Sequence, residues 1–262
     1  MSASPATPLP LVDRPAVRRI TGADLDWALS EGWKDFNAKR GDILVLAVLY
    51  PLLGLLTAVI ALNDRLLPVF FPLVAGLSVM GPAVAAGFYE IARRRDLGIS
   101  SSWMHFFDPL RGRSRTPLVI LTLMSLVLFG VWILAAWAIY QATLAQVGPM
   151  TLAGGFEQLF STPEGLNLVI IGNLVGAGFA VLTVFLTLVS FPMVVDRPVD
   201  AGTAVGTSVR AVTRNLPAVA AWGVRVAGLL LLGALPLFMG LAVVLPVLGY
   251  ATWHLYTRMI ER

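Results

Sequence analysis

Six long apolar stretches dominate this chain, at about residues 43–62, 66–91, 117–142, 167–191, 217–234 and 236–256. A helix needs ~20 apolar residues to cross the hydrocarbon of a bilayer, and each stretch meets or approaches that length. The composition agrees, because 57% of the residues are hydrophobic and only 13% are charged, against ~25% charged in soluble domains. We therefore predict an all-α, polytopic membrane protein with six transmembrane helices arranged as hairpins.

The Lys and Arg residues predict how these helices are threaded. If the six helices cross the membrane in succession, 17 of the 19 fall on the same side of it. They lie in the N-terminal region, the second and fourth loops and the C-terminus. Cytoplasmic loops retain an excess of Lys and Arg. Only Arg65 lies on the other side, and Arg225 lies within a span. Both termini are therefore predicted to be cytoplasmic.

Several function classes are excluded or disfavoured by the composition. The chain has no Cys, which excludes disulfides, thiolate metal sites and iron–sulfur clusters. The net charge of +4 lies at the ends of apolar spans, where it sets orientation and meets lipid headgroups, so no nucleic-acid partner is expected. Phosphate-binding glycine loops and hydrolase or metalloprotease motifs are absent. We expect no cofactor, no metal and no enzymatic activity.

The chain divides into a tail and one domain. Residues 1–20 begin with a Pro-rich segment without an apolar core and are predicted to form a disordered cytoplasmic tail. Residues 21–262 are predicted to form a single six-span membrane domain. Residues 23–38 and 99–110, and more weakly 205–212, carry apolar residues at helical spacing beside basic ones, which predicts amphipathic helices on the cytoplasmic surface of the membrane. Their expected interfacial anchors are Trp33, Phe36, Trp103 and Phe106.

Two parts of the sequence match each other. Residues 76–82 and 240–246 share glycine, leucine, valine and proline positions at an offset of 164, and that offset aligns Pro82 with Pro246 and Glu90 with His254. A second set of matches precedes spans one and five. Because each unit enters the membrane from the same side, we predict a parallel internal repeat. The inverted repeats of many secondary transporters have the opposite arrangement.

Three segments resemble a known family: GPAVAAGFYE at 81–90, DRPVD at 196–200 and LPVLGYATWHLY at 245–256. They are similar to a bacterial integral-membrane family catalogued as domain of unknown function 2189, and the resemblance extends from about Leu25 to Arg262. It implies a six-span protein of the bacterial inner (cytoplasmic) membrane with unestablished biochemistry. Some members are labelled cytochrome c oxidase subunits. Haem and copper ligation needs several intramembrane His, and the two His here do not support that label.

Four polar residues in predicted spans are the candidate site: Glu90, Asn173, Arg225 and His254. Intramembrane ionisable groups usually face the bundle interior and find partners. Glu90 and His254 are predicted to lie opposite each other, either as a proton-handling pair or as a hydrogen-bonded clasp between the repeats. Arg225 is expected to snorkel or to pair inside the bundle, and an anion or substrate site is the alternative. Asn173 is expected to bond between helices rather than to bind a ligand.

Small residues at four-residue spacing predict close helix packing. They are Gly172, Gly176 and Ala180 in span four and Ala83 and Gly87 in span two. Small residues on one face let another helix backbone approach in a membrane. The contact is expected within the bundle, with a homodimer or partner seam as the alternative.

Three functions remain open. The first is a non-enzymatic scaffold, accessory or assembly component of a membrane complex, with the lipid bilayer, another membrane protein complex or a second copy as partners. The second is a transporter or channel for a small or hydrophobic solute, which requires a polar cavity. The third is an enzyme acting on lipid, with His254 or Glu90 as the base, but the sequence shows no accompanying nucleophile.

Overall fold

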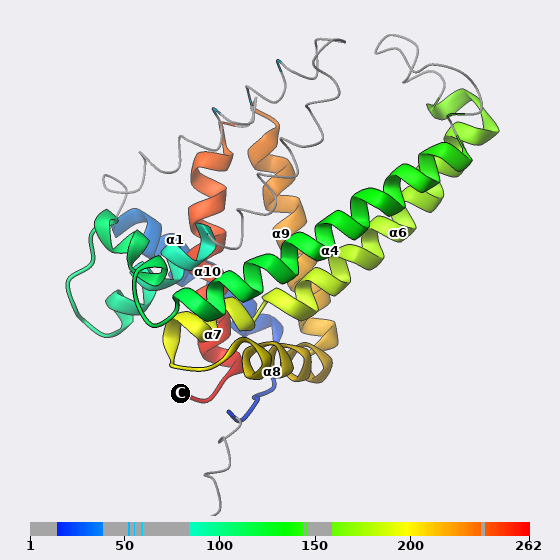
Figure 1. Ribbon diagram of the computed structural model, residues 1–262. Coiled ribbons are helices and arrows are strands. Elements are labelled where there is room, and N and C mark those ends of the chain that lie inside the picture. Colours follow the sequence, from blue (N-terminus) through cyan, green and yellow to red (C-terminus); the bar gives the residue numbers. More distant parts are fainter. Residues whose placement is uncertain are drawn as a thin grey trace, which may run out of the picture.

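The computed structural model describes residues 15–38, 52, 55, 59, 84–143, 145, 159–236 and 239–262. Within these residues the fold is all-helical (Figure 1). Residues 84–96 are helical, and a 3-10 helix, η1, follows at Trp103–Leu110. The remaining helices are α1 (Gly22–Ala38), α4 (Arg115–Ala142), α6 (Pro163–Thr187), α7 (Ser190–Asp196), α8 (Ala201–Arg214), α9 (Leu216–Ala234) and α10 (Leu241–Met259).

Three helices in this part of the chain are long and apolar enough to cross a membrane. They are α4, the continuous segment Pro163–Asp196 that joins α6 to α7, and α9. These correspond to the spans predicted at 117–142, 167–191 and 217–234. Apart from residues 52, 55 and 59, the span at 43–62 lies outside the described residues, as does most of the span at 66–91. The span at 236–256 corresponds to α10, which is helical but is not among the three, because its second half carries His254, Arg258 and other polar residues.

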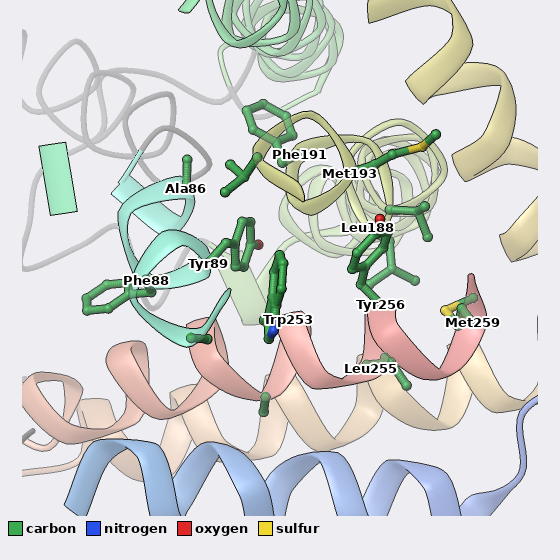
Figure 2. Close-up of a cluster of buried hydrophobic side chains, with 14 of the residues drawn as sticks. Ala86, Phe88, Tyr89, Leu188, Phe191, Met193, Trp253, Leu255, Tyr256 and Met259 are labelled. Atoms are coloured by element: carbon green, nitrogen blue, oxygen red, sulfur yellow. The ribbon is translucent and has the colours of Figure 1, made fainter. Parts of the chain in front are cut away.

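A compact core lies at one end of the long helices, around the second half of α10. The largest fully buried side chains include Tyr250, Trp253 and Tyr256 of α10. Figure 2 shows Trp253 beside Tyr89 of the helix at 84–96 and Tyr256 beside Leu188, just before α7. We call the part of the molecule that contains this core, together with residues 15–20 and 260–262, the base.

Helix α1 packs antiparallel along α10 within the base. Its buried face is formed by Leu25, Ala28, Gly32 and Phe36. A Cβ at Gly32 would lie 2.7 Å from the backbone nitrogen of Ala251, so only glycine permits this backbone approach. The sequence predicted a helix lying flat on the membrane at 23–38. The helix is present, but its apolar face contacts α10 and leaves Trp33 half exposed.

Residues 15–20 are held in the base and do not form a free tail. The backbone nitrogen of Arg18 donates to the carbonyl of Met259 at 2.8 Å, and that of Glu261 donates to the carbonyl of Ala16 at 3.1 Å. Asn215, at the junction of α8 and α9, accepts from the Ile20 amide and donates to the Arg18 carbonyl. The prediction of a disordered segment is therefore wrong for residues 15–20, because distant backbone and amide groups satisfy their hydrogen bonds.

The helices α4 and α6 run side by side as a hairpin away from the base (Figure 1). Leu118 and Leu121 of α4 are buried in the base, whereas Val127 and Leu134 are exposed and no later residue of α4 is buried. The most apolar 18-residue stretch of Pro163–Asp196 has no buried residue at all. Residues 122–142 of α4 extend for about 30 Å at ~1.5 Å per residue. That length matches the ~30 Å hydrocarbon thickness of a bilayer, which provides the apolar surroundings that the exposed side chains require.

The contact at Gly32 leads to a stability prediction. Gly32→Ala places a methyl group against the backbone of α10, and we expect the overpacking to cost about 1–3 kcal/mol. Gly206→Ala in α8 is the matched control, because no described atom lies within 4 Å of a Cβ at that position. The control should be neutral or stabilising by up to ~1 kcal/mol. Thermal unfolding in mild detergent, followed by circular dichroism, measures both. Equal stability of the two variants would contradict the close α1–α10 contact.

Candidate functional site: a charged network in the base

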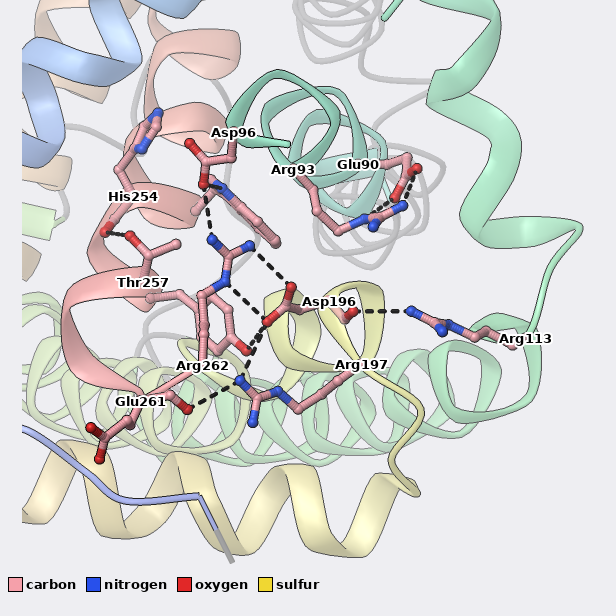
Figure 3. A network of polar contacts seen from close by, with 12 residues as sticks. Glu90, Arg93, Asp96, Arg113, Asp196, Arg197, His254, Thr257, Glu261 and Arg262 are labelled. Carbon is pink, nitrogen blue, oxygen red and sulfur yellow. Dashed lines mark hydrogen bonds and ion pairs between the residues drawn. The ribbon is translucent and has the colours of Figure 1, made fainter. Parts of the chain in front are cut away.

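Glu90 and His254, which the sequence predicted to face each other, have separate partners. The Glu90 carboxylate accepts hydrogen bonds from Arg93 at 2.8 Å and from Arg94 at 2.9 Å. All three residues belong to the helix at 84–96. The i,i+3 and i,i+4 spacings place these side chains next to each other on a helix. Figure 3 shows Glu90 and Arg93 paired at a distance from His254. The buried Glu90 charge is therefore compensated locally.

His254 instead contacts α1. Its Nε2 lies 2.9 Å from Oδ2 of Asp35, and both side chains are buried. Arg95 approaches the same carboxylate, with Nη1 3.2 Å from Oδ1. The imidazole edge also packs against Trp27 at 5.5 Å between ring centroids. Asp35 thus joins three segments, namely α1, α10 and the helix at 84–96.

A second cluster is centred on Arg262. Its Nη2 donates to Asp196 at 3.0 Å and its Nη1 to Asp96 at 3.1 Å (Figure 3). The hydroxyl of Tyr256 donates to Asp196 at 2.8 Å, and the indole of Trp253 donates to Asp96 at 3.0 Å. The Arg262 guanidinium also lies over the Trp253 ring, 4.8 Å from its centroid. One cation therefore bridges the end of α7 and the helix at 84–96.

The electrostatics of this cluster favour the charged form of Arg262. Burial alone would lower the pKa of the guanidinium, but the hydrogen bonds and negative charges of Asp196 and Asp96 outweigh burial and raise the pKa. Opposite charges at hydrogen-bond distance stabilise the ionised state. Because arginine keeps its proton at any accessible pH, the cluster works as a permanent ionic clasp.

Arg225 and Asn173 lie apart from these clusters. Nη2 of Arg225 pairs with Oδ1 of Asp26 on α1 at 2.9 Å. The guanidinium is about one-third exposed, and its partner is a residue that the sequence had not suggested. Asn173 donates to the carbonyl of Val169, one turn earlier in its own helix, at 2.7 Å. The four predicted polar residues therefore do not converge on one site.

Some of the predicted packing and anchor residues contact other parts of the protein, and others are exposed. Gly87 lets Phe106 of η1 approach, because a Cβ there would lie 2.5 Å from the ring. A Cβ at Gly172 would have no described atom within 4 Å, one at Gly176 would meet only Trp132 at 3.9 Å, and Ala180 is exposed on the same helix. Ala83 lies outside the described residues. Of the four anchors, Trp33 and Trp103 are exposed, whereas Phe36 and Phe106 are buried in the protein.

In the base, acidic and basic side chains neutralise one another. No group of three His, Cys, Asp or Glu side chains that could hold a metal ion occurs in the described part of the chain. The central carboxylates of Asp35, Glu90 and Asp196 each contact an arginine. Sequence reasoning missed Asp35, Asp96 and Arg262 as members of the network. Little in the sequence indicated their role, because each lies outside the apolar spans, where charged residues are common.

Asp196 gives a test of the clasp. Asp196→Ala removes the acceptor of Tyr256 and Arg262, and hydrogen bonds to charged groups contribute ~1.5–3 kcal/mol each. We expect a loss of about 2–4 kcal/mol in the free energy of unfolding. Arg18→Ala is the control, because Arg18 pairs with Glu261 on the surface, with both side chains more than half exposed. Exposed pairs contribute ~0–1 kcal/mol. A loss at Asp196 no larger than at Arg18 would contradict the network's structural role.

Comparison with known protein families gives one match, to part of the chain. No curated protein and no solved structure matches the chain. One family model does match, over residues 70–196, which include the first quoted motif and the beginning of DRPVD. The motif at 245–256 lies outside the matched range. The resemblance drawn from the sequence is confirmed: residues 70–196 of this chain match the family described as "Predicted integral membrane protein (DUF2189)".

Proposed function

We propose that this chain is a non-enzymatic scaffold, accessory or assembly component of another membrane complex. The observation that carries the proposal is the division of the molecule into two parts. Charged groups at the base are engaged with one another, while the α4–α6 hairpin presents an almost wholly apolar, exposed surface. Such a protein offers a surface for packing in the bilayer and retains few polar groups for a substrate.

The arrangement of polar residues supports this reading over a transporter or channel. A transported solute needs a lined path, and intramembrane polar residues normally mark it. Here Glu90 and His254 are buried and occupied by different partners, and Asn173 bonds within its own helix. Arg225 and Asp26 neutralise each other at the side of α9. The same pattern argues against an enzyme acting on lipid, because both candidate bases are already engaged in ion pairs or hydrogen bonds.

We also propose that the base lies in the cytoplasm and that the chain resides in the bacterial inner membrane. Residues 16–18 and 259–261 are hydrogen-bonded to each other, which supports an even number of crossings between them. The arginines of the second loop and of the C-terminal residues gather in the base as well. Segments rich in Lys and Arg are retained on the cytoplasmic side. The internal repeat stays a prediction, since Pro82 and most of span one lie outside the described residues.

Protein association is tested by purifying the affinity-tagged full chain in mild detergent. We expect a stoichiometric membrane-protein partner that survives size-exclusion chromatography. Gly172→Leu should weaken that association by more than tenfold, because a bulky side chain on the predicted packing face separates the helices. Gly178→Leu is the control, since it lies on another face of α6 and also has no described atom within 4 Å. Elution of a monodisperse chain without a protein partner, or solute transport by that chain in proteoliposomes, would contradict the proposal.

Membrane topology is tested with reporter fusions. Alkaline phosphatase fused after residue 155 should be active, because the loop between α4 and α6 is predicted to be periplasmic. Green fluorescent protein fused after residue 262 should fluoresce, because it folds in the cytoplasm. The reverse pattern at either position would show that the threading inferred from the Lys and Arg distribution is wrong.

A further inference from the structure

Exposed apolar side chains lie on η1 and on the residues just before it. They belong to Leu97, Ile99, Trp103, Met104 and Leu110. Each is about half exposed or more, and Met104 reaches 63%. We call these five residues the η1 patch. A patch of large apolar residues on one short segment is typical of a surface that contacts a membrane or another protein.

The η1 patch is held in place from behind. Phe106 is buried against Gly87 and packs edge-on against Phe88, with ring centroids 5.1 Å apart. Arg94 bonds to Asp108 at 3.0 Å and to the carbonyl of Ser100 at 3.0 Å. The segment is therefore docked on the helix at 84–96 through one face. Its other apolar face points outward as a consequence of this docking.

Three arginines follow the η1 patch directly. Arg111 and Arg113 lie in the turn after η1, and Arg115 is the first residue of α4. All three are exposed. Arg113 donates to the backbone carbonyl of Asp196 at 3.0 Å, but within the described residues none of the three forms an ion pair with a carboxylate. This differs from the base, where arginines are matched by acidic side chains.

These arginines directly precede or begin α4, so α4 indicates how deep they lie relative to the bilayer. Helix α4 is a candidate span, and exposed apolar residues begin at Val119, one turn after Arg115. Residues 122–142 match the hydrocarbon thickness, so Arg115, about 10 Å earlier along the helix at ~1.5 Å per residue, lies on the headgroup side of that boundary. Aromatic and aliphatic side chains beside cations are the composition of segments that bind at this boundary.

We infer that the η1 patch and Arg111, Arg113 and Arg115 together form a docking surface for anionic phospholipids of the bilayer that α4 crosses. The apolar side chains reach the acyl boundary, while the guanidinium groups bind lipid phosphates, which they match in bidentate geometry. The unmatched positive charge favours an anionic lipid surface over an uncharged one. This inference needs no protein partner and goes beyond the scaffold proposal.

The chain has no Cys, so one introduced thiol gives a unique labelling position. Met104→Cys in the full chain carries an environment-sensitive fluorophore in nanodiscs of phosphatidylcholine with 30% phosphatidylglycerol. Brominated phosphatidylglycerol should quench this probe more strongly than brominated phosphatidylcholine at equal content. Ala16→Cys is the control, because Ala16 is exposed in the base beside the Arg18–Glu261 pair. The probe at residue 16 should not be quenched by either lipid.

The charge requirement is tested by adding Arg111→Gln and Arg115→Gln to the Met104→Cys protein. The preference for brominated phosphatidylglycerol should fall up to about fivefold for each arginine removed, from ~1 kcal/mol per basic residue near an anionic surface. Arg18→Gln, in the surface pair with Glu261, should leave the preference unchanged. Equal quenching by both lipids, insensitive to the arginine substitutions, would overturn the inference. Absence of quenching at residue 104, with its thermal unfolding unchanged, would overturn it too and would point to a protein occupant.

Discussion

The close contact between α1 and α10 is the constraint on which the rest of the base depends. Gly32 brings the two backbones together at Ala251, and this approach places Asp35 beside His254 and Asp24 near Arg258. With α1 in position, α10 presents its other faces to the helix at 84–96 and to α7. Phe88 then packs against Gly249, where a Cβ would lie 2.9 Å from it. Glycines on both helices thus allow two neighbours to approach α10 closely.

Charge compensation explains how this tightly packed region can bury charged side chains. Burying a single charge without a partner costs several kcal/mol, yet the base contains buried Asp35 and Glu90. Each has an arginine within hydrogen-bond or ion-pair distance. Breaking one member of such a pair leaves the other charge buried and unpaired, which is more costly than losing both. The network therefore favours one arrangement of the helices over alternatives that separate these charges.

The apolar spans were predictable from the sequence because length and hydropathy alone determine whether a helix can cross a bilayer. The predicted spans at 117–142, 167–191 and 217–234 coincide with α4, α6 and α9 for this reason. Partners of polar residues were not predictable, since periodicity identifies the apolar face of a helix but not what covers it. The apolar side of α1 satisfied the pattern of a surface helix, yet α10 covers it. Likewise His254 is 219 residues from Asp35, and no local pattern links them.

The pairing of residues 16–18 with 259–261 has a consequence for biosynthesis. A ribosome adds residues from the N-terminus, so the first described segment leaves it long before its partner segment exists. Closing a loop of this length also carries an entropic cost that grows slowly with chain length. The membrane helices can insert one after another during translation, but the base cannot close until residues 259–261 have left the ribosome. Until then Ala16 and Arg18 lack their partners Glu261 and Met259, so this part of the nascent protein is available to chaperones and proteases.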